Sequence, residues 1–357
     1  MFPKIYRAPE TMDGAGTDVP AQGFVVAEGS EVQLPDGFDP TGAAYTREGP
    51  DLMLTDSDGT QIVVADFFMQ GTPPTLMGEG GVRIDGALAA RLAGPATPGM
   101  VAGEMVSSEA IGQVHALTGE VFVIRADGTR LALHIGDPMF MGDILETGAA
   151  AGIGVLLADG TALSMGEDAR MVLDEMVYDP GTQEGTLAVS MMRGIFTVVS
   201  GQISKTDPDA MAIHTPVGTI GIRGTQIGVD LHDGHTLNLV MMEEADGFVG
   251  EAFFTNAGGV MTLNQAYYAL QVASYDAPPA PLPMYGRDML LQTFGVTFAF
   301  LPISGTNGND YGLQAALNEG LAGFEAMAGE DMEGPDMGAE GLAGFDQARP
   351  TGQPLET

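Results

Sequence analysis

Histidine and aspartate residues close together in the sequence are the first candidates for chemistry. His232 and His235 lie three residues apart, next to Asp230 and Asp233. Imidazole and carboxylate groups bind zinc, but a structural zinc site needs four ligands, and Asp233 with Gly234 forms a typical hairpin-turn pair. We therefore expect a solvated loop here and no zinc site. The other histidines stand alone in strand-like segments, where we expect them to lie on outward faces or to form hydrogen bonds with the backbone: His115, His134 and His214.

Calcium is the one cofactor for which the sequence offers clustered oxygen donors. Asp56 and Asp58 belong to the turn Asp-Ser-Asp-Gly, and Asp310 ends a Gly-Thr-Asn-Gly-Asn-Asp stretch. The first stretch lacks the distal glutamate of an EF-hand. The second resembles one degenerate copy of the glycine-aspartate nonapeptide of RTX proteins, in which adjacent copies share each ion. Calcium at Asp56, Asp58 or Asp310 is a hypothesis, and no other cofactor is expected.

Signals for catalysis are missing from the sequence. There is no Gly-x-Ser-x-Gly nucleophile elbow, and the Gly-Ile-Arg-Gly-Thr stretch lacks the lysine of a phosphate-binding loop. Carboxylate pairs such as Glu167 with Asp168 are adjacent in sequence, so on a strand they would point to opposite faces. We therefore predict that the chain is not an enzyme.

The composition narrows the class of protein further. Thirteen basic side chains stand against 48 acidic ones, giving a formal net charge of -35. Nucleic acids and anionic lipids are bound chiefly by cationic surfaces, so neither is an expected partner. Cysteine is absent, which excludes disulfides and thiolate metal sites. The 52 glycines and 22 prolines favour tight turns between short strands, and we expect an all-β fold.

We expect neither a cleavable secretory signal nor a membrane span. Residues 1–7 are followed by Pro, Asp and Gly rather than by an apolar region with a small-residue cleavage site. No window reaches the roughly 18 uninterrupted apolar residues that a spanning helix needs. If the protein leaves the cytoplasm, an uncleaved C-terminal signal is the expected route.

Shifts in composition and strand-like patterning divide the chain into segments. Residues 51–54 and 61–64 flank an Asp-Gly turn and predict a β-hairpin, while residues 85–92 predict a short helix. The expected segments are a disordered arm (1–20), a small N-terminal β module (21–98), a linker (99–110), a second β module (111–240), a C-terminal β extension (241–303) and an acidic, Gly/Met-rich disordered tail (304–357).

The stretch from His214 to Gln226 reads His-Thr-Pro-Val-Gly-Thr-Ile-Gly-Ile-Arg-Gly-Thr-Gln. It resembles the signature of the FecR-like domain, a β-rich module of bacterial extracytoplasmic proteins. Pairs such as Gly119-Glu120, Gly142-Asp143 and Arg193-Gly194 follow the order of that family over residues 110–240. Strand spacing alone leaves a sandwich, a barrel and a coil of stacked strands open. The resemblance implies a twisted, solenoid-like stack of short strands.

The residues of this motif are expected to have structural roles. Glycine permits positive φ or close backbone approach, and proline cannot donate to a ladder, so we expect Pro216 at the start of a strand. Val217 should be buried with the two isoleucines, and Arg223 should collect unpaired carbonyls at a bend. The motif residues are Thr215, Pro216, Gly218, Ile220, Gly221, Ile222, Arg223, Gly224 and Thr225.

The N-terminal segment also resembles a module of large type I-secreted adhesins of Gram-negative bacteria, through residues 49–60, 63–67 and 81–86. Together the resemblances imply a non-enzymatic, periplasmic, cell-surface or secreted protein that binds a protein, a glycan or a cell-envelope component. One alternative is a FecR-type iron-signalling regulator, whose expected sigma-binding domain and membrane helix we do not find. A second alternative is a polysaccharide-acting β-solenoid enzyme, which would need two carboxyl groups facing each other in a cleft.

Overall fold

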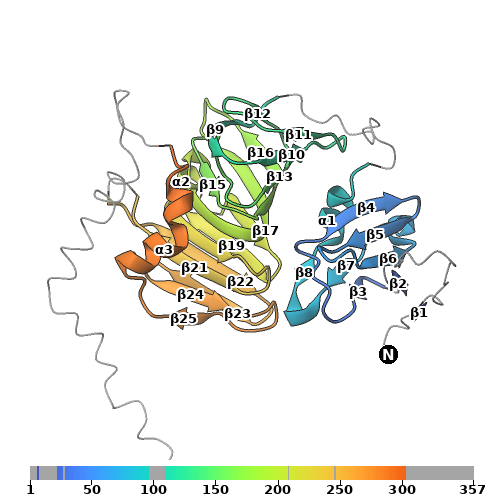
Figure 1. Cartoon of the computed structure of the whole chain (residues 1–357). Helices are drawn as coiled ribbons and strands as arrows, with labels where there is room; N and C mark the ends of the chain where they lie inside the picture. Colours follow the sequence, from blue (N-terminus) through green and yellow to red (C-terminus); the bar gives the residue numbers. More distant parts are fainter. Residues whose placement is uncertain are drawn as a thin grey trace, which may run out of the picture.

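The computed structural model describes residues 6–7, 22–26, 29–95, 109–207, 209–244 and 247–302. Strands dominate these residues, so the all-β prediction is confirmed. The predicted disordered tail (304–357) lies outside the described residues, as do most of the predicted arm (1–20) and linker (99–110). Figure 1 shows two bodies side by side, which we call the N-terminal module (residues 6–7 and 22–95) and the ladder (residues 109–302).

The N-terminal module contains two small sheets. The first has the order β1-β2-β6-β5-β4 and the second the order β3-β7-β8. Their strands are β1 (Tyr6–Arg7), β2 (Gln22–Val26), β3 (Glu31–Gln33), β4 (Ala44–Glu48), β5 (Asp51–Thr55), β6 (Gln61–Ala65), β7 (Thr75–Met77) and β8 (Arg83–Ile84), with two 3-10 turns, η1 (Phe67–Met69) and η2 (Glu79–Gly81).

Two local predictions for this module are confirmed. Strands β5 and β6 form an antiparallel hairpin, and Asp56 closes its turn by accepting hydrogen bonds from the backbone N–H groups of Asp58 and Thr60. Helix α1 (Gly86–Leu92) begins after Asp85, whose carboxylate accepts from the N–H groups of Ala87 and Leu88. That carboxylate is an N-cap, which satisfies donors that the first helical turn leaves unpaired.

The ladder consists of two facing sheets that share one strand. Sheet I has the order β12-β9-β14-β15-β17-β20-β21-β24-β25, and sheet II the order β11-β10-β13-β16-β17-β18-β19-β22-β23. The strands are β9 (Gly112–Thr118), β10 (Val121–Ile124), β11 (Arg130–Ala132), β12 (Pro138–Met139), β13 (Ile144–Thr147), β14 (Gly152–Leu157), β15 (Ala162–Met165), β16 (Arg170–Tyr178), β17 (Gly185–Val199), β18 (Met211–Thr215), β19 (Gly218–Arg223), β20 (Gln226–Leu231), β21 (Leu237–Met242), β22 (Glu251–Asn256), β23 (Gly259–Leu263), β24 (Ala269–Val272) and β25 (Ala280–Leu282).

Strand β17 crosses from one sheet to the other. Its first half pairs with β16 and β18 in sheet II, and residues 194–199 pair with β15 and β20 in sheet I. The crossing lies at Gly194, which has a φ of 119°. A side chain there would overlap Ala169. Glycine is therefore required at this position both by backbone conformation and by space.

The inward faces of the two sheets form one large hydrophobic core, which includes Leu145, Val189, Phe196 and Ile220. Within the described residues of the ladder, β17 and β18 form the one parallel pair, and every other pairing is antiparallel. The predicted solenoid is not confirmed, because tight hairpin turns reverse the chain where a coil would carry it onward. The sheets do not close on themselves and end in four edge strands: β11, β12, β23 and β25.

Strand pairing continues past residue 240, where the sequence suggested that the second module ends. Strand β22 pairs with β19, and β24 pairs with β21. Residues 287–298, expected within the C-terminal β extension, instead form helix α3 (Arg287–Phe298), so that part of the prediction is wrong. Helix α3 covers the outward face of sheet I through Leu290 and Phe294. A second short helix, α2 (Gln202–Thr206), follows β17. In the part of the chain that the structure describes, no helix has the length and apolar character to cross a membrane.

Candidate functional site at the junction of the two modules

The N-terminal module packs against the outward face of sheet II. Ile144, Val172 and Met192 of the ladder are buried in the same apolar cluster as the core of the N-terminal module. Burial of this apolar surface is the main attraction between the two bodies.

Polar contacts surround that apolar patch and fix the orientation of the two bodies. Arg193 forms an ion pair with Asp39 at 3.1 Å, and Arg170 donates to the carbonyl of Ala43 at 2.6 Å. The backbone N–H of Arg83 donates to the carbonyl of Pro216 at 2.8 Å. The interface therefore combines apolar burial with hydrogen bonds of defined direction.

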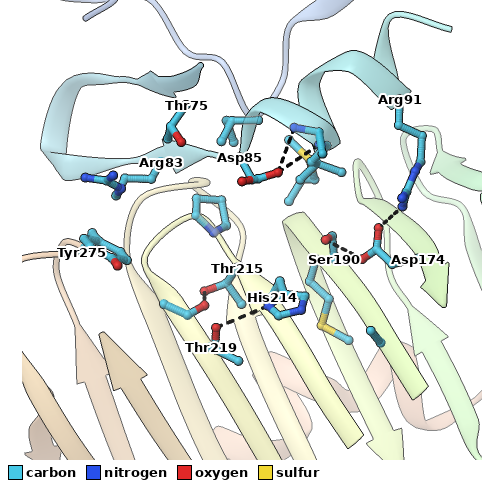
Figure 2. A pocket seen from close by; sticks show the side chains of 18 of the residues that line it. Thr75, Arg83, Asp85, Arg91, Asp174, Ser190, His214, Thr215, Thr219 and Tyr275 are labelled. Carbon is cyan, nitrogen blue, oxygen red and sulfur yellow. Dashed lines mark hydrogen bonds and ion pairs between the residues drawn. The ribbon is translucent and has the colours of Figure 1, made fainter. Parts of the chain in front are cut away.

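A cavity of about 550 Å³ lies at this junction. Figure 2 shows side chains of the N-terminal module, among them Arg83, Asp85 and Arg91, above the strands of sheet II. The floor carries a row of polar residues that are cross-strand neighbours: Ser190 of β17 pairs in register with His214 of β18, and His214 pairs with Thr219 of β19. Tyr275 closes one side, where the guanidinium of Arg83 lies 4.6 Å from its ring centre.

Asp174 has partners on both bodies that form the cavity. It lies where the register of β16 shifts against β17, between Leu173 and Glu175. Its carboxylate forms an ion pair with Arg91 of α1 and accepts a hydrogen bond from Ser190 Oγ at 2.6 Å. Burial raises the pKa of Asp174, while Ser190, Arg91 and the nearby His214 oppose that rise. This carboxylate connects α1 of the N-terminal module to β17 of the ladder.

Serine, histidine and aspartate side chains thus meet in one cavity, but their hydrogen bonds are not those of a catalytic triad. Ser190 donates directly to Asp174, and His214 Nδ1 lies 3.3 Å from Thr219 Oγ1. A nucleophilic serine would need the histidine as its base. The arrangement is suited to holding two bodies together.

The remaining carboxylates of the cavity also have structural partners. Asp85 caps α1, and Glu175 accepts from Thr186 Oγ1 at 3.2 Å. Polysaccharide hydrolysis would require two carboxyl groups with access to a glycosidic bond. The carboxylates of this cavity are instead engaged in a helix cap, a cross-strand bond and an ion pair.

A protein-family model described as FecR protein matches residues 143–243. The chain carries a FecR domain. The matched residues run from just before β13 of sheet II to just after β21, so the floor of the cavity belongs to this domain and its roof to the N-terminal module. No curated protein matches the chain.

Solved structures give weaker similarities. Two crystal structures of a candidate anti-sigma factor from Parabacteroides distasonis ATCC 8503 match with 13% and 12% identity and TM-scores of 0.31 and 0.32. They cover 39% and 43% of this chain, which spans 58% and 65% of the length of those two chains. A structure described as a cell surface anchoring domain matches with 33% identity and a TM-score of 0.17, over 18% of this chain and 83% of that one. These TM-scores are too low to support an argument, and the adhesin resemblance of the N-terminal module remains a prediction without support.

The motif of the FecR domain forms the hairpin of β18 and β19 and the bend that follows it. Pro216 and Val217 make the turn, so Pro216 lies before β19 and does not start a strand as predicted. In this turn Thr215 Oγ1 donates to the carbonyl of Gly218 at 2.7 Å. Val217, Ile220 and Ile222 are fully buried.

The three glycines of the motif meet different constraints. Gly218 and Gly224 have φ values of 155° and 59°. A side chain at Gly221 would overlap the ring of Phe253. After the bend, Thr225 exchanges hydrogen bonds with Ser200: its N–H donates to Ser200 Oγ at 2.8 Å, and its carbonyl accepts from the N–H of Ser200 at 3.1 Å.

Arg223 does not collect backbone carbonyls, so that prediction is wrong. Its guanidinium forms ion pairs with Glu251 of β22 and, at 3.0 Å, with Asp209. It also lies 5.2 Å from the centre of the Phe253 ring. Carboxylates on neighbouring segments satisfy an exposed guanidinium at a lower desolvation cost than buried carbonyls would.

The other predicted sites have local partners. His232 Nδ1 lies 2.6 Å from Asp230 Oδ1, and this hydrogen bond raises the pKa of His232. Asp56 is engaged in its turn, whereas Asp310 lies outside the described residues. Among the residues that the structure describes, no group of three or more His, Asp or Glu side chains could hold a metal ion. Calcium binding therefore stays a hypothesis.

Sequence analysis missed the junction itself. Arg91 and Asp174 are 83 residues apart, and nothing in the local pattern of either segment indicates that they meet. The available signal was the scarcity of basic residues. The chain has 13 Lys and Arg residues and 48 Asp and Glu residues, so each arginine has many possible acidic partners. The arginines in predicted helices and strands were therefore candidates for structural ion pairs.

Proposed function

We propose that this protein is a non-enzymatic binding and structural protein, in which the FecR domain is a rigid scaffold that binds another protein outside the cytoplasm. The observation that carries the proposal is the junction cavity. Its potentially reactive side chains do not form a nucleophile-base pair, because Ser190 donates to Asp174, Asp174 pairs with Arg91, and His214 lies beside Thr219.

The construction of the ladder supports a scaffold role. The strand shared by both sheets ties their two layers together, and helix α3 and the N-terminal module cover one outward face each. Such a body presents its remaining surfaces and sheet edges in a fixed geometry. Fixed geometry lowers the entropy cost of binding a partner.

The proposed compartment is the periplasm, the cell surface or the medium of a Gram-negative bacterium, with type I export as the route. The high negative charge favours solubility where counterions screen it, and it argues against nucleic acid as a partner. A regulator of the iron-signalling type is the second candidate, because it is built on the same domain.

Fractionation of the native host tests this proposal. The chain is detected in cytosol, periplasm, outer membrane and medium, in cells with a functional type I exporter and in cells without it. In cells with the exporter we expect the chain outside the cytoplasm. In cells without it we expect the chain to accumulate in the cytosol. Confinement to the cytosol of exporter-competent cells would overturn the proposed compartment. Co-purification with a sigma factor would instead favour the regulator.

A further inference from the structure

The four edge strands of the ladder differ in how well they are protected against pairing with another chain. An edge strand exposes unpaired N–H and C=O groups, and proteins protect such edges with proline, charged side chains or very short strands. In sheet I, the edges β12 and β25 carry Pro138 and Pro281. In sheet II, the edge β11 is three residues long and includes Arg130, whose guanidinium stacks 3.5 Å from the centre of the Phe122 ring.

Strand β23 has none of these protections. It reads Gly-Val-Met-Thr-Leu over residues 259–263, without proline or charge. Val260 is 67% exposed and Thr262 is also exposed, whereas Leu263 turns into the core. Among the described residues, β22 is the one strand that pairs with β23.

The surroundings of β23 hold the tip of its hairpin in place. Asn256, at the tip of the β22-β23 hairpin, donates to the carbonyls of Ser274 and Ala277 at 3.1 and 2.8 Å and accepts from the N–H groups of Gly258 and Gly259. The segment that contains Ala277 therefore fixes the tip of the hairpin, and among the described residues β22 is the one strand that pairs with residues 260–262. An edge strand that is held rigidly needs little ordering when a partner strand adds to it.

We propose that β23, which extends sheet II beyond the matched FecR residues, is the docking edge of the ladder and that its occupant is an extended, basic segment of a partner protein, which adds to sheet II as a further strand. This inference rests on the proposed function as a protein-binding scaffold. Charge decides the kind of occupant: a chain with a net charge of -35 attracts a basic segment and repels a second copy of itself. The exposed Val260 and Thr262 favour β-branched residues at the facing positions of the added strand.

Binding of synthetic peptides to the full chain tests the docking edge. A random library of 12-residue peptides is selected on the purified protein and counter-selected on the double variant Val260→Lys/Thr262→Lys, whose new charges imitate a protected edge. We expect selected peptides that alternate Val, Ile or Thr with Lys or Arg and that bind the double variant at least tenfold more weakly. The matched control Leu131→Lys, at the protected edge β11, should bind as the unchanged protein does.

Main-chain pairing gives a second measurement. Methylation of alternate backbone nitrogens of a selected peptide should abolish binding in one register and leave it within about threefold in the other, since only every second amide of an added strand faces β23. Hydrogen exchange of those amides of residues 260–262 that point away from β22 should slow at least tenfold when the peptide binds, whereas the amides paired with β22 should change less.

Several outcomes would overturn the docking edge: no selected peptide, acidic peptides, equal binding to the double variant, or a concentration-dependent dimer of the chain in sedimentation. The compartment is tested separately by fractionation. A cytosolic chain that still binds basic peptides at β23 would reject the proposed compartment and keep the docking edge. An exported chain in which the bound peptides protect a strand other than β23 would keep the proposed compartment and reject the docking edge.

Discussion

Arg91 of helix α1 and Asp174 of strand β16 form an ion pair that joins the N-terminal module to the FecR domain. The Asp174 side chain is 15% exposed and that of Arg91 is 36% exposed, so the pair is partly screened by solvent on the arginine side. Its position beside the Ser190 hydroxyl gives the carboxylate a second partner on the ladder.

The first prediction concerns the energetic coupling of this pair. Arg91→Ala leaves a buried carboxylate without its cation and should destabilise the protein more than Asp174→Asn, which keeps an acceptor for Ser190. In a double-mutant cycle measured by urea unfolding, we expect a coupling energy of about 1–3 kcal/mol. Additive effects of the two substitutions would show that the ion pair contributes nothing to docking.

The second prediction concerns the pH dependence of stability. Asp143 is fully buried beside Arg125, and burial raises its pKa to about 6 although Arg125 and the N–H of Phe140 oppose the rise. Because the folded state then holds its proton more tightly than the unfolded state, Asp143 lowers stability as the pH rises from about 4 to 6. The free energy of unfolding of Asp143→Asn should therefore increase relative to the wild type over this window, by on the order of 3 kcal/mol. Unfolding curves at pH 4.5, 5.5 and 7 measure the difference, and a constant offset at all three pH values would contradict the prediction.

The third prediction concerns Gly221 of the FecR motif. Gly221→Ala places a methyl group against the Phe253 ring and should destabilise the chain by about 1–3 kcal/mol, as overpacking does. Because the obstacle is one aromatic ring, the double variant Gly221→Ala/Phe253→Leu should recover part of the loss. Gly71→Ala is the matched control, since a side chain there would meet open space and its backbone is not in the left-handed region, and its stability should be unchanged.

The fourth prediction concerns the packing of helix α3 on sheet I. Phe294→Ala removes a fully buried ring from the cluster with Tyr285 and Leu290 and should cost about 3–5 kcal/mol. Met289 on the same helix is 51% exposed, so Met289→Ala should change stability by less than about 0.5 kcal/mol. Thermal or urea unfolding compares the two, and equal effects would mean that α3 does not stabilise the ladder.

The sequence predicts much of the local structure because residue types that favour turns and helix caps stand at the ends of its apolar segments. The hairpin of β5 and β6 follows from an Asp-Gly turn between two apolar runs, and α1 follows from the Asp85 cap. Helix α3 was missed because its residues include Phe, Thr, Val and Gly295, which favour strands or turns over helices. Its packing against sheet I outweighs that local preference.

The site was less predictable than the fold. The FecR motif indicates where the hairpin of β18 and β19 lies, but the cavity also needs α1 and β8, more than 120 residues earlier in the chain. Arg223 shows the same limit, because its partners Asp209 and Glu251 come from segments before and after it that meet only in the folded sheet. A single sequence does not record which distant carboxylate an arginine meets.

The strand that belongs to both sheets has a consequence for how this protein responds to mechanical load. Tension that pulls the two layers apart loads residues 185–199 together with the connections between the sheets, and the two halves of this strand are each flanked by neighbours on both sides. The two sheets cannot separate while residues 185–199 stay hydrogen-bonded to both of them. A molecule under tension should therefore unfold in a single event rather than strand by strand.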